Sequence, residues 1–375
     1  MAGTTARKAE QLSIVASGGV DATRSPGWED VHLVPDALPE VDLDEVDCSR
    51  RFLDLPLRAP LLISGMTGGH PQAGPINARL ARAAERHGVA MGVGSQRAAL
   101  EDDAMAATFA VAREEAPSAL VIANLGATQL IAQRGDAPDP LDTANAAIAM
   151  IRADALAIHL NVAEELVQIE GDRRTEGCPA AIEALCTRLD VPVLVKETGS
   201  GVSRRTAERC AEMGVRALDI GGSGGTSFAT VEAIRAGRHG DQQRARLGRM
   251  LSGWGLPTVV SLVGAATSGL PIVASGGVRS GLDAAKAIAL GADLVGVGRP
   301  LLEAALESDA AVEAWIEGFV LELRAVMTLC GAVRLADLKT VPRAVLGTSH
   351  ALIEELDYGR DDVSLAGAGM GRLRR

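Results

Sequence analysis

Residues Ala155–Gly171 read ALAIHLNVAEELVQIEG, a strand-length apolar run followed by a cluster of polar side chains. The run from Ala155 to Ile158 is typical of a buried strand. His159, Asn161, Glu164 and Glu165 follow it directly. A buried strand that ends in an imidazole, an amide and two carboxylates places proton-transferring and metal-binding groups at one edge of a sheet. We therefore expect the fold to be organised around this edge.

The same alternation of an apolar run and an Ala-rich segment begins at Leu61 and continues through the chain. The expected strands are Leu61–Ser64, Val89–Val93, Leu120–Asn124, Ala155–His159, Val193–Lys196, Ala217–Ile220, Pro271–Ser275 and Leu294–Val297. The segments between them are mostly helix-like, for example Pro75–His87 and Gly281–Leu290, which both precede a glycine. Alternating strands and helices predict an α/β protein with parallel strands. Eight units predict a (β/α)8 TIM barrel whose active site lies at the carboxyl ends of its strands.

Polar or Gly-rich residues follow every expected strand. In chain order they are Met66-Thr67-Gly68-Gly69, Gly94-Ser95-Gln96-Arg97, Asn124, His159 to Glu165, Lys196-Glu197, Gly221 to Thr226, Gly276 to Arg279, and Gly298-Arg299. Ordinary surface loops would not carry such a cluster after each strand, so the pattern favours one active site built from all of them.

The regions outside the expected barrel are less regular. Residues 1–59 predict an irregular, polar N-terminal arm with a short strand or hairpin at Phe52–Leu57, and they are expected to contribute to the substrate site. A disordered arm is the alternative, although Trp28 offers a group that can dock. Residues 60–300 form the expected barrel, with an insertion at about 227–255 that suggests a lid or an interface element. Residues 301–375 predict C-terminal helices and a frayed tail.

Composition restricts the class of protein. The 375 residues are 47% hydrophobic, with a formal net charge of −11. This charge argues against a nucleic-acid or anionic-membrane binder. The five cysteines include no CxxC pair and indicate reduced thiols. No apolar run resembles a signal peptide or reaches membrane-spanning length, so we expect a cytoplasmic protein without a membrane partner.

The glycine loops after the last three strands predict a phosphate site. Gly276 to Arg279 and Gly298-Arg299 carry both glycine and arginine, which suits backbone and side-chain binding of a phosphate, whereas tight turns alone are the alternative. The loop from Gly221 to Thr226 would by itself be weak evidence for a phosphate site. Together the loops indicate one phosphate-bearing cofactor. Lys196 would then lie beside an electron-accepting ring such as a flavin, or form a salt bridge with Glu197.

A second group of residues is suited to a phosphorylated substrate. Arg7-Lys8 and Arg97 offer charge and bidentate donors. If the segment after His159 is helical, Asn161 and Glu165 share a face suited to Mg²⁺, and Glu164 points elsewhere, toward the reacting part of a substrate. A satisfied histidine with solvated glutamates is the alternative.

The chain resembles type 2 isopentenyl-diphosphate isomerase, an FMN-dependent (β/α)8 enzyme of isoprenoid biosynthesis. The resemblance is carried by RK at 7–8, MTGG at 66–69, GSQR at 94–97, NLGA from Asn124, HLNxxxE at 159–165, KETGSGVS at 196–203, GGT at 224–226, SGGVRSGLDAAKAIALGAD at 275–293 and VGRP at 297–300. It covers most of the chain.

The resemblance implies a role for each matching residue. FMN would contact Met66, Thr67, Gly68, Ser95, Asn124, Lys196, Thr226, Gly277, Arg279, Gly298 and Arg299. The substrate diphosphate would contact Arg7, Lys8, Ser95, Gln96, Arg97, His159 and Asn161, and Glu165 would hold Mg²⁺. His159 and Glu164 would be catalytic. The family isomerises isopentenyl diphosphate to dimethylallyl diphosphate by protonation and deprotonation at reduced FMN, commonly reduced by NADPH, in homo-oligomers that are commonly tetramers or octamers.

Three positions depart from the family. Gln11 replaces the histidine of RKxxH, Glu164 replaces the glutamine of HLNxxQE, and Gly221 stands where serine is frequent. The first two lie in the substrate half, so the alternative is a divergent member that rearranges or cyclises a prenyl diphosphate or related alkene, with Glu164 as an altered acid or base. A 2-hydroxy-acid-oxidising flavoenzyme would leave the diphosphate residues without a purpose. A flavin-binding protein without catalytic activity is the remaining alternative.

Overall fold

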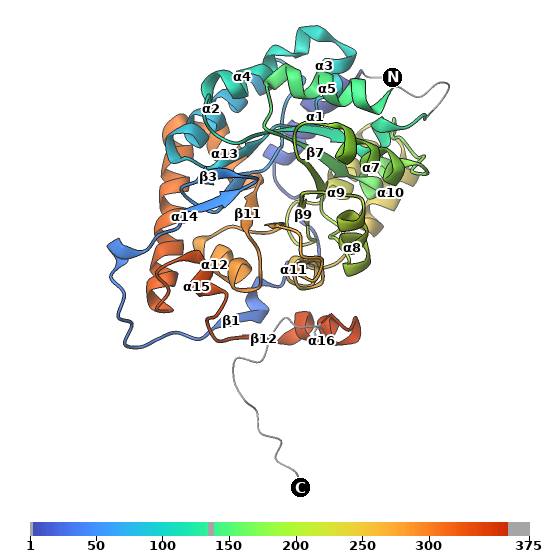
Figure 1. The fold of residues 1–375 in the computed structure, drawn as a ribbon. Coiled ribbons are helices and arrows are strands. Elements are labelled where there is room, and N and C mark those ends of the chain that lie inside the picture. Colours follow the sequence, from blue (N-terminus) through green and yellow to red (C-terminus); the bar gives the residue numbers. More distant parts are fainter. Residues whose placement is uncertain (1–2, 134–138, 359–375) are drawn as a thin grey trace.

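The eight expected strands form a closed parallel barrel in the computed structural model, which describes residues 3–133 and 139–358 (Figure 1). The barrel strands are β4 (Leu61–Ile63), β5 (Ala90–Gly92), β6 (Val121–Gly126), β7 (Ala155–Leu160), β8 (Val193–Glu197), β9 (Ala217–Asp219), β10 (Ile272–Ser275) and β11 (Leu294–Val297). They follow one another around the barrel in chain order, and β11 pairs with β4 to close it. The predicted (β/α)8 barrel is therefore confirmed.

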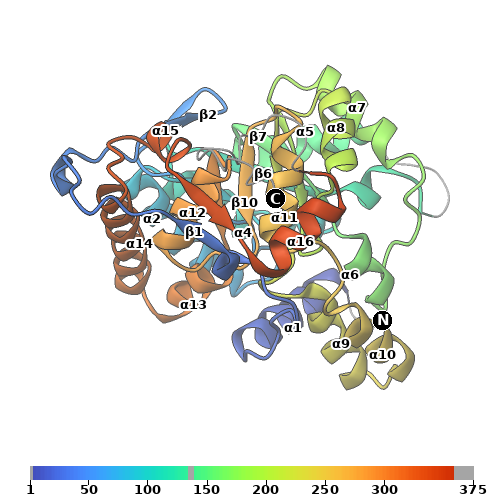
Figure 2. The ribbon, with the colours of Figure 1, turned by 90° about the horizontal axis from the view of Figure 1, so that it is seen from below.

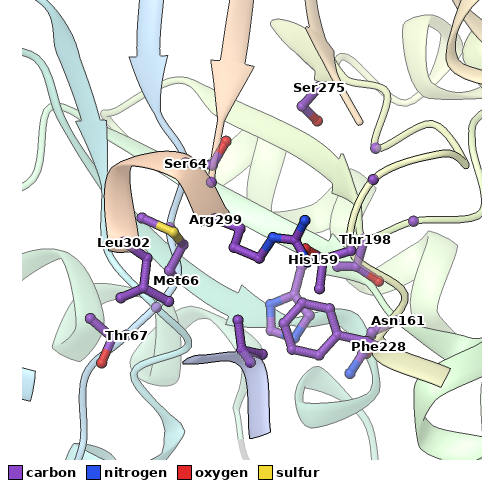
Figure 3. A pocket seen from close by; sticks show the side chains of 18 of the residues that line it. Ser64, Met66, Thr67, His159, Asn161, Thr198, Phe228, Ser275, Arg299 and Leu302 are labelled. Atoms are coloured by element: carbon purple, nitrogen blue, oxygen red, sulfur yellow. The ribbon is translucent and has the colours of Figure 1, made fainter. Parts of the chain in front are cut away.

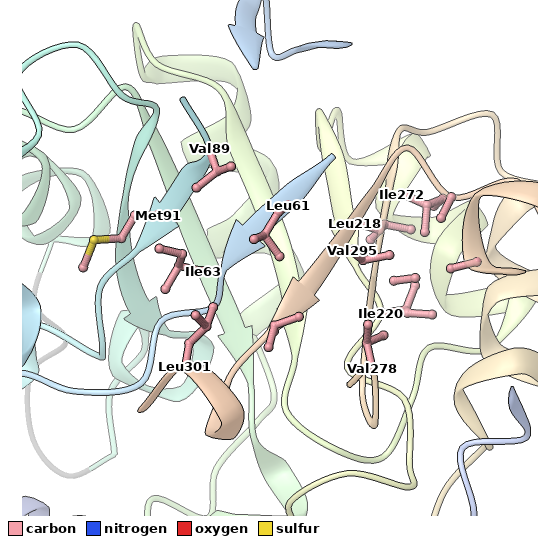
Figure 4. Packing of buried hydrophobic residues seen from close by; sticks show 14 of the residues in the cluster. Leu61, Ile63, Val89, Met91, Leu218, Ile220, Ile272, Val278, Val295 and Leu301 are labelled. Atoms are coloured by element: carbon pink, nitrogen blue, oxygen red, sulfur yellow. The ribbon is translucent and has the colours of Figure 1, made fainter. Parts of the chain in front are cut away.

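Two apolar layers explain why nearly every residue of these strands is hydrophobic. Leu61 and Ile63 face outward into the cluster between the strands and the helices, as do Val295 and Leu218 in other strands (Figure 4). Leu62, between the first two, belongs to a separate cluster inside the barrel. Successive side chains of a strand point to opposite faces, so a strand buried on both faces reads as a continuous apolar run.

A β-hairpin closes the amino end of the barrel. Its strands β2 (Arg50–Phe52) and β3 (Leu55–Leu57) pair in antiparallel register, which confirms the short hairpin expected there. Phe52 and Leu57 are buried in the same cluster as the inward side chains of the barrel strands. Because this end is filled by apolar side chains, the open end of the barrel is the one where the strands terminate.

Helices surround the barrel and follow its strands. They are α2 (Ala73–His87), α3 (Arg97–Glu101), α4 (Ala107–Glu115), α5 (Pro140–Ile151), α6 (Val162–Val167), α7 (Cys178–Arg188), α8 (Arg204–Glu212), α9 (Phe228–Arg238), α10 (Gln242–Leu251), α11 (Thr258–Ala266), α12 (Gly281–Ala289) and α13 (Arg299–Glu307). The 3-10 turns are η1 (Trp28–Asp30), η2 (Leu43–Glu45), η3 (Asp103–Met105) and η4 (Ala127–Leu130).

The N-terminal arm differs from the prediction in one respect. It is not irregular throughout, because α1 spans Thr4–Ala16. The helix has no side-chain hydrogen bond at its N-cap, Gly3, and buries only Ile14 and Val15, so the usual sequence signals of a helix are weak. Trp28 is buried, so the arm is docked and the alternative of a disordered arm is wrong.

The insertion at about 227–255 is a pair of packed helices. α9 and α10 pack against each other, and α9 also contacts α1 and α6 (Figure 2). The next helix, α11, packs against α8 and β10 and so belongs to the outer layer of the barrel. The insertion therefore adds a helical wall next to α1, at the end where the barrel strands terminate.

The C-terminal region is helical, as expected. It contains α14 (Asp309–Leu329), α15 (Leu335–Leu338) and α16 (Gly347–Glu355), and the strand β12 (Arg343–Val345) pairs with β1 (Val31–Leu33) of the arm. The predicted frayed tail lies outside the described residues. Across the residues that the structure describes, no helix is both long enough and apolar enough to cross a bilayer.

Candidate active site

A cavity of about 490 Å³ lies at the carboxyl ends of the barrel strands (Figure 3). This volume is in the range of small-molecule sites. Its lining includes most residues expected from the sequence: Arg7, Lys8, Met66, Thr67, Gly68, Ser95, Asn124, His159, Asn161, Glu164, Glu165, Lys196, Thr226, Gly277, Arg279, Gly298 and Arg299. The departing positions Gln11 and Gly221 line it as well. The fold thus brings together both groups of predicted residues.

Two predicted substrate ligands, Gln96 and Arg97, do not line this cavity. Gln96 is fully buried; its amide donates to the carbonyl of Ala147 at 2.8 Å and accepts from the backbone N–H of Asn124 at 2.9 Å. Arg97 forms salt bridges of 2.7 Å with Glu101 and 2.6 Å with Asp172. Both side chains thus form hydrogen bonds or salt bridges to other protein groups. In this structure they stabilise the walls of the site.

The segment after β7 brings one amide and two carboxylates together. The short helix α6 follows Asn161, whose Nδ2 donates to Glu164 at 3.1 Å and to Glu165 at 3.0 Å. Burial, followed by the charges of Glu165 and Glu232, raises the pKa of Glu164 to about 8. Burial likewise raises the pKa of Glu165. Glu164 is therefore a carboxylic acid at neutral pH and can donate a proton.

His159 is buried and neutral. Its Nδ1 lies 2.8 Å from Oδ1 of Asn124, whose Nδ2 donates to the carbonyl of Val93 at 2.9 Å. Burial, and next the charge of Lys196, lowers the pKa of His159 to about 3. Among these protein groups His159 is therefore neutral at pH 7 and offers a hydrogen-bonding ring nitrogen.

Lys196 pairs with a residue that the sequence analysis did not single out. Its Nζ lies 3.0 Å from Oδ2 of Asp219 and donates to the backbone carbonyl of Glu197 at 3.1 Å. The expected alternative, a side-chain salt bridge with Glu197, is wrong. Glu197 instead accepts three backbone N–H groups from Gly199 to Gly201, at 2.6 to 3.0 Å. The carboxylate of Asp219 keeps Lys196 at the cavity wall.

The two arginines of the phosphate loops converge on one carboxylate of the arm. Arg279 donates to Asp21 at 2.8 Å, and Arg299 donates to it at 2.7 and 3.1 Å. The arm also explains one glycine of these loops: Gly277 has a φ of +68°, and a Cβ there would lie 2.7 Å from Cγ of Pro26. The arm thus packs directly on the predicted phosphate loops.

Helix α1 brings the predicted substrate cations to the cavity. Lys8 donates to the carbonyl of Ser95, and its Nζ lies 5.4 Å from the ring centre of Phe109. Burial and the charge of Arg7 lower the pKa of Lys8 to about 7. Gln11 donates to Glu232 at 2.7 Å and to Glu164 at 3.4 Å. The two departing positions Gln11 and Glu164 are therefore in contact.

Several buried polar atoms of the cavity lining have no partner among the described residues. They are Nε of Arg7, Oγ of Ser95 and Oδ1 of Asn161, together with Oγ of Ser64. A buried polar atom without a hydrogen bond is costly, so this set fits ligands that carry oxygen and charge. The donors and the glycine loops suit FMN. The Asn161 oxygen beside Glu165 suits Mg²⁺, a hard cation that prefers oxygen ligands.

Sequence reasoning missed three contributors to the site. Asp219 interrupts the apolar run of β9, and a charged residue inside a buried strand was the signal available for it. Asp21 and Glu232 do not interrupt an apolar strand run, so the sequence pattern does not mark them as site residues. Each is identified only by its contacts, Asp21 with Arg279 and Arg299, and Glu232 with Gln11.

Known proteins resemble this chain over nearly its whole length. A family model described as FMN-dependent dehydrogenase matches residues 137–343. Isopentenyl-diphosphate delta-isomerase of Methanoregula boonei is 51% identical, over 94% of this chain and 97% of that protein. The protein of the same name from Methanosarcina mazei is 45% identical, over 97% of this chain and 98% of that protein.

Among solved structures, a flavocytochrome b2 variant has a similar fold. Its TM-score is 0.66 at 19% identity, and the match covers 97% of this chain and 86% of that chain. A lactate oxidase of Pediococcus acidilactici matches with a TM-score of 0.62 at 17% identity, covering 90% and 87% of the two chains. At this identity the likeness extends to the barrel fold alone.

Proposed function

The chain belongs to the isopentenyl-diphosphate delta-isomerase family, and we propose that it interconverts isopentenyl diphosphate and dimethylallyl diphosphate with FMN as cofactor. The observation that carries the proposal is the shared cavity. The cations of α1 and the acids after β7 share one cavity with Lys196 and the two arginine loops. A diphosphate and a flavin can therefore be bound side by side.

The substrate is held through its charged end. Arg7 and Lys8 reach the cavity from α1, and the unpartnered Nε of Arg7 is a free donor for a phosphate oxygen. The unpartnered Oδ1 of Asn161 and the carboxylate of Glu165 would hold Mg²⁺, which neutralises part of the diphosphate charge. His159 would offer the substrate a ring nitrogen as a hydrogen-bonding group.

The flavin half is formed by Lys196 and the loops after the last barrel strands. Arg279 and Arg299 would hold the FMN phosphate, and Lys196 would lie at the ring, held by Asp219 at 3.0 Å. When bound, reduced FMN supplies the group that exchanges a proton with the alkene. The chain contributes binding, orientation and the exclusion of water from the reacting carbon.

A second candidate function is favoured by the acid at Glu164. In a divergent member, the protonated carboxyl group would donate a proton to a prenyl diphosphate or related alkene and so begin a rearrangement or cyclisation. Gln11 and Asn161 both donate to this carboxyl group and hold it in place. Gln11 and Glu164, which both differ from the family pattern, are in contact, and this supports the second candidate function.

The remaining properties follow the family pattern. We include in the proposal that NADPH reduces the flavin, that Mg²⁺ is required, and that the protein is a cytoplasmic homo-oligomer, a tetramer or octamer. Sedimentation of the holoprotein tests the assembly. A dominant monomer would contradict that part of the proposal without affecting the reaction.

One experiment separates the two candidate functions. Dithionite-reduced holoprotein is incubated with isopentenyl diphosphate and Mg²⁺ under anaerobic conditions in D₂O, and the products are analysed by NMR. Deuterated dimethylallyl diphosphate is the expected result. Recovery of undeuterated substrate alone would contradict the isomerase proposal, and longer or cyclised prenyl substrates would then be tested for the second candidate.

The purified protein must also bind the flavin. We expect a yellow protein that bleaches with dithionite and binds FMN after the cofactor has been removed. A protein that stays colourless after incubation with FMN would overturn the FMN part of the proposal.

A further inference from the structure

Arg235 on α9 is a buried arginine that the binding scheme above does not use. Its side chain is only 1% exposed. It forms salt bridges with three carboxylates, Glu10 at 3.0 Å, Glu170 at 2.5 Å and Glu232 at 3.1 Å. A buried guanidinium is stable only when its donors are matched in this way.

The three carboxylates come from three different segments. Glu10 lies on α1, Glu170 follows α6, and Glu232 lies on α9 itself. Glu170 accepts two hydrogen bonds from Arg235, of 2.8 and 2.5 Å. Arg235 therefore joins the substrate helix α1 to the segment after β7 that carries the acids. Binding three carboxylates at once requires a planar cation with several donors, and the single ammonium group of lysine cannot replace it.

Helix α1 is attached largely through polar contacts. It buries only Ile14 and Val15, near its C-terminal end. Its first half is held by polar contacts: Thr4 with Glu101 at 2.5 Å, Lys8 with the carbonyl of Ser95, and Glu10 with Arg235. The Thr4 contact is exposed and so contributes little. The Glu10 contact ends on the buried Arg235, and Gln11 adds a 2.7 Å hydrogen bond to the buried Glu232 of the same helix, α9.

Arg235 also reaches the reacting end of the site. Glu232, which it binds, accepts a 2.7 Å hydrogen bond from Gln11, and Gln11 also donates to Glu164. His239 lies 3.0 Å from Glu10 at the edge of the same cluster. The cluster is therefore continuous from α9, through α1, to the acid in the cavity.

We propose that Arg235 is a positioning residue that docks α1 over the cavity through Glu10, and that this docking raises the affinity for the diphosphate substrate. The inference rests on the proposed function for its kinetic consequence. Its structural part, the docking of α1, is independent of any reaction.

The test compares two variants with one control. Glu10→Gln removes the charge that α1 offers to Arg235 and, at the edge of the cluster, to His239. Arg235→Met removes the cation and keeps an unbranched side chain. The control is Arg238→Met, because Arg238 is exposed on the same helix. FMN titration of each variant checks that the barrel is folded, since these residues do not line the flavin half.

Trypsin reports the docking directly, because Arg7 and Lys8 are themselves cleavage sites inside α1. We expect Glu10→Gln and Arg235→Met to lose their first seven or eight residues about tenfold faster than the parent and the control, as followed by intact mass. Equal cleavage rates in all four proteins would overturn the proposal, whether or not the chain is an isomerase.

Steady-state kinetics test the effect of the docking on substrate affinity. If the docked population falls to about one tenth, KM for isopentenyl diphosphate rises about tenfold while kcat changes little. A fall in kcat with unchanged KM would show that Arg235 acts on the chemistry and would contradict the docking role. If no variant, nor the parent, isomerises the substrate, the proposed function fails and the trypsin result still decides the docking.

Discussion

Glu164 determines how the site responds to pH. The pKa of its carboxyl group is raised from 4.5 to about 8, chiefly by burial. The folded protein therefore keeps a proton that the unfolded chain releases above pH 4.5, so this group makes folding less favourable as pH rises from about 4.5 to 8. Glu164→Gln removes this dependence, and we expect the variant to gain stability over the parent steadily across that interval. Urea unfolding at several pH values in EDTA measures it.

The control for this comparison is Glu176→Gln, an exposed residue near the same segment. Its difference from the parent is expected to stay constant with pH. A Glu164→Gln difference that is equally constant would mean that the carboxyl group is ionised throughout. In that case Glu164 could not serve as the acid of the second candidate function.

Lys8 predicts a proton change on substrate binding. Burial and Arg7 lower its pKa to about 7, so at pH 8 much of it is neutral in the free protein. A bound diphosphate favours the ammonium form, so binding takes up as much as about one proton per site. Calorimetry with isopentenyl diphosphate in phosphate and in Tris buffers gives this number from the difference in apparent enthalpy. The Lys8→Met variant removes the uptake, and equal uptake in both proteins would assign it to another group.

The contact between Gln11 and Glu164 shows what residue-by-residue reading misses. The sequence identifies each as a departure from the family, but they stand 153 positions apart. Nothing in the local pattern shows that the amide of one donates to the carboxyl group of the other. The same holds for Asp21 and its two arginines, because contacts between distant segments follow from the closed fold.

At the level of elements, strands were easier to predict than the helix that completes the site. The eight barrel strands are apolar on both faces, so each stands out in the sequence. Helix α1 buries only Ile14 and Val15 and has no capping hydrogen bond, so its sequence resembles that of an irregular arm. The helix is stabilised largely by partners from other segments, which local sequence does not contain.

The hairpin at the amino end of the barrel predicts a large effect of one substitution. Phe52 is 3% exposed and fills the barrel end together with the inward side chains of the strands. Phe52→Ala is therefore expected to lower the free energy of unfolding by about 3–5 kcal/mol. Leu38→Ala is the control, since Leu38 is 86% exposed and its loss should cost less than about 0.5 kcal/mol. Similar urea midpoints for both variants would mean that the hairpin does not stabilise the barrel.

On the scale of the whole molecule, the site needs parts that the barrel does not provide. The barrel supplies Lys196 and the arginine loops, the arm supplies α1 and Asp21, and α9 supplies Arg235. The glycine loops and polar strand ends could be predicted from the sequence, since their pattern repeats with every strand. The arm and the insertion could be placed near the site only by the fold.

The arm also predicts how the flavin half is controlled. Asp21 occupies Arg279 and Arg299, the groups proposed to hold the FMN phosphate, so FMN must compete with a carboxylate of the chain. Asp21 is 45% exposed, and pairs of this kind are worth less than about 1 kcal/mol. We therefore expect Asp21→Asn to bind FMN about threefold more tightly, a difference that shrinks in 0.5 M salt because exposed charges are screened there. Quenching of flavin fluorescence measures the affinity, with Asp42→Asn, an exposed change in the same arm, as the control. Weaker binding by Asp21→Asn would instead mean that the carboxylate aligns the two arginines for the phosphate.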